Sequence, residues 1–87
     1  MSSVPYSNAM ANAVEIGHHL PDVPGHMGLI DQCITAATLM GELEDSDAIK
    51  WEDIDKDWSE ACSKIASAIA RTYKSPSKSE IEKLVLS

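Results

Sequence analysis

Apolar residues recur every three or four positions along two long stretches of the chain. In the first stretch they are Leu29, Ile30, Cys33, Ile34, Ala37, Met40 and Leu43. In the second they are Trp51, Ile54, Trp58, Ala61, Cys62, Ile65, Ala68 and Ile69. Because this spacing places an apolar stripe along one side of a helix, it predicts helices over about residues 26–43 and 50–73. The connection at 44–47 is short and rich in capping residues, so the two helices should form an antiparallel hairpin.

Shorter helices are predicted on both sides of this hairpin. Ser7 is a favourable N-cap for a helix over about residues 8–19, and the prolines that follow end it, because proline disfavours helical geometry in the residue before it. Ser77 and Glu80 form a capping-box pattern ahead of a helix over about 78–86. So short a helix is unstable alone, and we expect it to dock on the hairpin or on another copy of the chain.

No part of the pattern indicates β-structure, since strict alternation and hairpin turn dipeptides are both missing. The length of 87 residues allows one small domain. A chain of this size buries only about 60% of its extended surface when it folds alone, which favours self-association. The sequence therefore predicts an all-α, oligomeric protein with one helical domain over residues 1–87: an antiparallel helical hairpin with short flanking N- and C-terminal helices.

The formal charge of −7 argues against a protein that binds duplex DNA or RNA. Seven Lys and Arg against 14 Asp and Glu would not neutralise a phosphate backbone. The uncharged apolar runs are far shorter than the ~20 residues that span a bilayer, and residues 1–6 have neither the basic start nor the apolar run of a signal peptide. We therefore expect a cytoplasmic protein that binds neither duplex nucleic acid nor a membrane.

The charges are unevenly distributed along the chain. Residues 1–41 carry three acids and no Lys or Arg, residues 42–60 carry nine acids and two lysines, and residues 61–87 carry five basic residues and two acids. Opposite charge at the two ends of a hairpin would favour head-to-tail or antiparallel pairing of subunits. The alternative is that these charges form a solvated surface that keeps a small protein soluble.

Zinc binding and catalysis have little support in the sequence. His18, His19 and His26 with Cys33 or Cys62 are suitable ligand types, but the closely paired spacing of a structural zinc site is missing. Both cysteines lie on apolar stripes, which favours buried, reduced side chains over a nucleophile. The carboxylates of 42–60 have no evident partner base, and no glycine-rich phosphate loop follows a strand. We expect no catalytic residue, no metal and no cofactor, and hence not an enzyme.

A cluster of groups that can bind phosphate lies near the end of the second long helix. It consists of Lys64, Arg71, Thr72, Tyr73 and Lys74. Arg71 follows the small-residue run 66–70, where another backbone can approach closely, and a guanidinium offers two parallel donors to phosphate oxygens. The alternative is that Arg71 only stabilises the C-terminus of its helix through the helix dipole.

The segments Trp58–Ala61 and Ala68–Arg71 resemble the second-helix pattern of the phage anti-CBASS sponge proteins, helical-hairpin proteins that sequester cyclic oligonucleotide messengers. The resemblance extends toward the N-terminus. Ile30 precedes Arg71 by the interval found in that family, and Tyr6 lies in a short N-terminal segment that also contains a tyrosine there.

The resemblance implies a non-catalytic homohexamer that binds cyclic di- and trinucleotides in pockets between subunits. Such a phage protein would block antiphage immune signalling in the cytoplasm of an infected bacterial host. Arg71 matches the pocket arginine of the family, and His26 is among the few groups that can supply positive charge on the N-terminal side. The candidate ligand-binding residues are Tyr6, His26, Lys64, Arg71, Thr72 and Lys74.

Two other classes of function remain open. The acidic segment 42–60 is compatible with an inhibitor that mimics nucleic acid or docks on a basic protein. The apolar faces, built from Ala, Met and Trp, are compatible with a structural protein that assembles through its helices.

Overall fold

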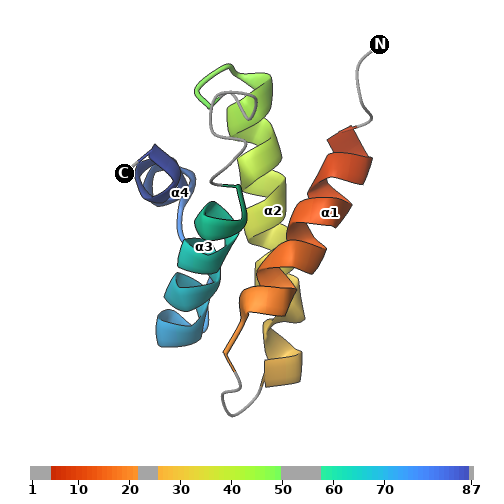
Figure 1. The fold of residues 1–87 in the computed structure, drawn as a ribbon, viewed down its shortest axis with the longest axis vertical. Helices are drawn as coiled ribbons and strands as arrows, with labels where there is room; N and C mark the ends of the chain where they lie inside the picture. Colours follow the sequence, from red (N-terminus) through yellow and green to blue (C-terminus); the bar gives the residue numbers. More distant parts are fainter. Residues whose placement is uncertain (1–4, 22–25, 50–57, 87) are drawn as a thin grey trace.

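The computed structural model describes residues 5–21, 26–49 and 58–86, with side chains from residue 10 onward in the first stretch and from residue 28 onward in the second. All regular structure in these stretches is helical, and no strand occurs in them (Figure 1). The elements are α1 (Pro5–His19), the 3-10 turn η1 (His26–Leu29), α2 (Ile30–Asp45), α3 (Trp58–Thr72) and α4 (Lys78–Leu86). The prediction of an all-α protein is confirmed.

Local chemistry explains where the helices begin and end. α1 begins at Pro5, three residues before the expected start. Proline is tolerated in the first turn of a helix because an N–H at that position would have no partner within the helix. The first four residues of the expected second helix form η1, and α2 continues to Asp45. Ahead of α4 both bonds of the capping box are present: the Ser77 N–H donates to Glu80 Oε1 at 3.0 Å, and the Glu80 N–H donates to Ser77 Oγ at 3.2 Å.

The helices α1, α2 and α3 run in alternating directions along the long axis of the molecule, and α4 crosses them at one side (Figure 1). α1 packs most extensively on α2 and next on α3, whereas α2 and α3 contact each other less. The N-terminal helix is therefore part of the core. Ile16 and Leu20, at the end of α1, are buried in the same apolar cluster as the other helices. The expected helical residues 50–57 lie outside the described residues.

The core is an apolar cluster to which every α-helix contributes. Its buried members are Ile16, Leu20, Leu29, Cys33, Ala36, Ala37, Met40, Leu43, Ile49, Ala61, Cys62, Ile65, Ala66, Ile69, Ile81 and Val85. Six of these are alanine or cysteine on α2 and α3, and such small side chains let neighbouring helices approach closely. In the parts of the chain that the structure describes, no helix combines the length and apolar character needed to cross a membrane.

Two polar contacts join segments that are far apart in sequence. The Trp58 Nε1–H at the start of α3 donates to Asn12 Oδ1 on α1 at 2.9 Å, and Asn12 is buried. The backbone N–H of Ser75, between α3 and α4, donates to Gln32 Oε1 on α2 at 2.9 Å. Because a buried polar group is costly unless it is paired, these contacts favour one relative placement of the helices.

Candidate functional site

A cleft of about 430 Å³ lies between the C-terminal turn of α3 and α4. Its lining residues are Ala68, Arg71, Pro76, Glu80, Lys83 and Leu84. The connection between the two helices contains only residues 73–77, so α4 returns toward the end of α3 and brings Lys83 to the same cleft as Arg71. The volume lies within the ~300–1,000 Å³ that is usual for small-molecule sites.

Among the described residues, the charged groups that line the cleft are two cations and one carboxylate. Arg71 and Lys83 carry the positive charges, and Glu80 carries the negative charge. The Glu80 carboxylate accepts the Ser77 N–H, and this bond, supported by the Ser77 side chain and by nearby Lys83, lowers the pKa of Glu80 below its ordinary value. Glu80 is therefore ionised at neutral pH and partly engaged by the capping box. One net positive charge remains to attract an anion.

The rest of the cleft lining is apolar or small. Ala68 on α3, Pro76 in the connection and Leu84 on α4 supply this part. A guanidinium can donate two parallel hydrogen bonds to phosphate oxygens, an ammonium adds a mobile positive charge, and an apolar floor can cover a sugar or a base. The arrangement is suited to binding a small ligand that carries both phosphate and apolar surface.

Three of the other sequence-predicted residues lie on or just after α3, outside the cleft lining. Lys64 lies two turns, about 10 Å, before Arg71 along the helix axis and pairs with Glu60 at 3.9 Å. Thr72 directly follows Arg71, and its hydroxyl lies 3.0 Å from the carbonyl oxygens of Ala68 and Lys74. The Thr72 oxygen also accepts the Lys74 N–H at 3.3 Å, so this hydroxyl is engaged in the turn that ends α3. Lys74 is exposed.

Tyr6 and His26, the remaining predicted ligand-binding residues, belong by their backbone to α1 and η1. Their side chains lie outside the described part of the structure. The structure thus brings one predicted residue, Arg71, into a described cleft.

Lys83 is the cleft residue that the sequence analysis missed. A usable signal existed, because the capping box fixes the start of α4 and places Glu80 and Lys83 three residues apart, on one side of that helix. The sequence does not show how α4 is rotated relative to α3, so it does not show that this side meets Arg71.

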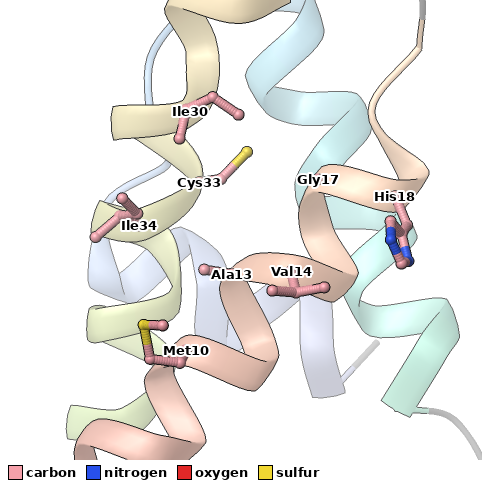
Figure 2. A pocket seen from close by; sticks show the side chains of 8 residues that line it. All are labelled: Met10, Ala13, Val14, Gly17, His18, Ile30, Cys33 and Ile34. Carbon is pink, nitrogen blue, oxygen red and sulfur yellow. The ribbon is translucent and has the colours of Figure 1, made fainter.

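A second cavity, of about 370 Å³, is an apolar groove between α1 and α2 (Figure 2). Its lining residues are Met10, Ala13, Val14, Gly17, His18, Ile30, Cys33 and Ile34. Ile30 and Ile34 belong to the apolar stripe that was expected to face the core, yet 42% and 49% of their surfaces are exposed. The apolar stripe on α2 is wider than the part of α2 that is buried in the core. Ile30 and Ile34, at the edge of the stripe, therefore line the groove.

A third cluster joins the end of α1 to the start of α3. His19 Nε2 lies 3.0 Å from Glu15 Oε2 and 3.0 Å from Ser59 Oγ, and the Ser59 hydroxyl donates to Glu15 Oε2 at 3.1 Å. In a catalytic triad the two ring nitrogens face different partners, the carboxylate and the serine. Here the same nitrogen, His19 Nε2, faces both the carboxylate and the serine. The cluster is therefore a polar contact between helices and does not have the geometry of a catalytic triad.

The two cysteines are free and buried. Burial raises the pKa of the Cys33 thiol. Burial and, secondarily, the charge of Glu15 raise the pKa of Cys62 to about 12. Both sulfurs are therefore protonated at neutral pH, which disfavours attack and metal binding by them. Among the described residues, no group of three or more His, Cys, Asp and Glu side chains is arranged to hold a metal ion.

Comparison with known proteins gives no assignment: no family model, curated protein or solved structure matches this chain. The cleft, the groove and the residues that line them are therefore the features from which a function can be inferred.

Proposed function

We propose that this protein is a non-catalytic sponge that binds cyclic di- or trinucleotides and keeps them from their receptors. In this proposal it acts in the cytoplasm of a bacterial host infected by phage, where it blocks antiphage signalling. The observation that supports it is the cleft between α3 and α4, in which Arg71 lies with a second cation and an apolar floor. The resemblance of the Arg71 segment to the sponge family suggests the nucleotide class.

The proposed binding mode assigns a separate task to each part of the cleft. The Arg71 guanidinium binds a phosphate through two hydrogen bonds, and Lys83 neutralises the remaining charge. Ala68 and Leu84 contact the sugar or base. No bond is made or broken, so the protein acts by lowering the free concentration of the messenger.

The proposal includes assembly as a homohexamer of helical hairpins. A neighbouring subunit would then complete each pocket, and Tyr6, His26 and Lys74 are the residues that we propose to contribute from outside the cleft. A small core with a two-turn terminal helix also favours association.

The test is calorimetric titration of the full chain with a panel of cyclic di- and trinucleotides. Charge-assisted bonds to phosphate contribute about 1.5–3 kcal/mol each, so Arg71→Ala should weaken binding by roughly ten- to a hundredfold or more. Lys83→Ala should weaken it to a smaller degree. Lys78→Ala is the matched control, since Lys78 lies on the same helix, outside the cleft lining, and its ammonium pairs with Glu42 at 2.8 Å.

Three results would contradict the proposal. They are a wild type that binds none of these nucleotides, an Arg71→Ala variant with unchanged affinity, and a Lys78→Ala control that loses affinity as strongly as Arg71→Ala. Native mass spectrometry of the same samples would count subunits and bound ligands together.

A structural assembly protein is the second candidate, and the apolar groove between α1 and α2 favours it. A wild type that binds no cyclic nucleotide but forms a stable oligomer would favour this class. The acidic-inhibitor alternative depends on residues 42–60, of which 50–57 lie outside the described residues. If the wild type captured a basic host protein and the Asp53→Lys, Asp55→Lys variant did not, that alternative would be favoured.

A further inference from the structure

Glu80 is the residue of the cleft between α3 and α4 that phosphate binding does not explain. Arg71 and Lys83 attract an anion to this cleft, and a carboxylate beside them opposes that attraction. The capping box requires a side chain that accepts the Ser77 N–H, but an uncharged glutamine also serves in such a box. A negative charge at this position is therefore consistent with a second role, toward the ligand.

The Glu80 carboxylate retains acceptor sites that a ligand can use. An ionised carboxylate has about four lone-pair positions and no donor. The Ser77 N–H occupies one of these positions at Oε1 and is the main cause of the lowered pKa of Glu80. Within the described ranges no cation forms an ion pair with Glu80, although Lys83 lies close enough to contribute to the lowering of its pKa. Glu80 is also exposed, so a ligand can reach it.

The two walls of the cleft suit different parts of a nucleotide. Glu80 and Leu84 are four residues apart on α4, so their side chains are neighbours on one side of this helix. Arg71 belongs to the other wall, on α3. A nucleotide whose phosphate is bound by Arg71 can rest its base on Leu84, with the polar edge of the base toward the Glu80 carboxylate.

A carboxylate distinguishes guanine from the other bases by the donors that guanine carries. The Watson–Crick edge of guanine has two adjacent donor groups, N1–H and N2–H2, which match the two oxygens of one carboxylate. Adenine and cytosine have one donor group beside a ring-nitrogen acceptor, and uracil has one donor between two carbonyl oxygens. Those acceptors would face the carboxylate and be repelled by it. Proteins commonly read unpaired bases through hydrogen bonds to this edge.

We infer that the cleft selects nucleotides that contain guanine, and that Glu80 is the residue that recognises the base. The inference rests on the proposed function, because it takes the cleft to be a nucleotide site. Guanine N1–H and N2–H2 donate to the Glu80 carboxylate, while the Arg71 guanidinium binds the phosphate. Two cations and one carboxylate leave one net positive charge, which matches the single negative charge of one phosphodiester.

The first test compares two cyclic dinucleotides that differ only in their bases. In calorimetric titration, cyclic di-GMP should bind the wild type roughly tenfold more tightly than cyclic di-AMP. Glu80→Gln keeps the size of the side chain and an acceptor for the Ser77 N–H, but it places an amide donor where guanine needs an acceptor. The preference for guanine should therefore disappear. A general effect of removing one negative charge would change both affinities alike and cancel in their ratio.

Glu82→Gln is the matched control for this test. Glu82 lies on the same helix, outside the cleft lining, and the substitution removes the same charge. It should leave the preference for cyclic di-GMP unchanged. Arg71→Ala should weaken both ligands by a similar factor, because the phosphate is common to them, and should also leave the preference in place. Circular dichroism would check that all variants keep the helicity of the wild type.

The second test uses GMP and AMP, which present the same bases without the cyclic backbone. Chemical-shift titration of the wild type should show tighter binding of GMP, and Glu80→Gln should remove the difference. A preference for GMP that depends on Glu80, without binding of any cyclic dinucleotide, would support base recognition by the cleft and contradict the sponge.

Other outcomes would overturn the inference. Equal affinity of the wild type for cyclic di-GMP and cyclic di-AMP would exclude selection of guanine and leave the sponge intact. A preference for guanine that persists in Glu80→Gln, or that is lost equally in Glu82→Gln, would show that Glu80 caps α4 and does not recognise the base. A wild type that binds none of these nucleotides would overturn both the inference and the proposed function.

Discussion

Replacing Asn12 by alanine should destabilise the protein measurably, because Asn12 connects α1 to α3 inside the core. The residue is 5% exposed, and its Oδ1 accepts the Trp58 Nε1–H at 2.9 Å. Removing this acceptor leaves a part-buried indole N–H without its partner, which costs about 1–3 kcal/mol. Alanine recovers up to ~0.7 kcal/mol through its higher helix propensity. The expected net loss is about 1.5 kcal/mol, or roughly 6–12 °C in the melting temperature of a domain of this size.

Urea unfolding followed by circular dichroism would measure this loss at one fixed protein concentration, since association also changes apparent stability. A double-mutant cycle with Trp58→Phe isolates the hydrogen bond, and we expect a coupling of about 1 kcal/mol. Ser67→Ala serves as the control, because Ser67 is exposed on α3 and its replacement should change stability by no more than about 0.5 kcal/mol.

Two results would refute this reasoning. One is a loss below about 0.5 kcal/mol for Asn12→Ala, which is the range of ordinary surface substitutions. The other is simple additivity of Asn12→Ala and Trp58→Phe, which would show that the two side chains do not interact. Either would mean that α1 does not pack against the start of α3 through this pair.

Two further predictions concern helix ends and helix interiors. Since the Ser77 N–H lowers the pKa of Glu80 in the folded protein, the stability gained from ionised Glu80 is present above the unfolded-state pKa of ~4.3 and is lost as pH falls through the folded-state value. Glu80→Gln should therefore weaken the dependence of melting temperature on pH in this acidic range, and an unchanged dependence would contradict the capping role. Gly41→Ala should raise stability by about 0.5–1 kcal/mol in urea unfolding, because the added carbon meets nothing within 4 Å; a loss of stability would show that something packs there.

The features that local sequence determines were predictable. The 3.6-residue apolar period identified the helical class, and the Ser77–Glu80 pattern identified a cap whose two hydrogen bonds are both present. Such signals depend on residues a few positions apart, so they need no knowledge of the rest of the chain. Arg71 was likewise found from its neighbours in sequence, and the structure places it in a cleft.

The features that depend on how helices are rotated against one another were not predictable. Lys83 joins Arg71 only because α4 returns along a particular side of α3, and the Asn12–Trp58 bond exists only because α1 packs against both α2 and α3. The rotation of one helix relative to another cannot be read from the apolar period of a single helix or from its capping residues.

The apolar stripe on α2 contains residues in two different environments, although the sequence pattern is the same for both. Its repeat does not distinguish Cys33 and Met40, which are fully buried, from Ile30 and Ile34, which are about half exposed. The face that α1, α3 and α4 cover is narrower than the stripe, so one edge is left over at the groove. Helical periodicity alone therefore does not separate the part of an apolar stripe that the fold buries from the part that it leaves at the surface.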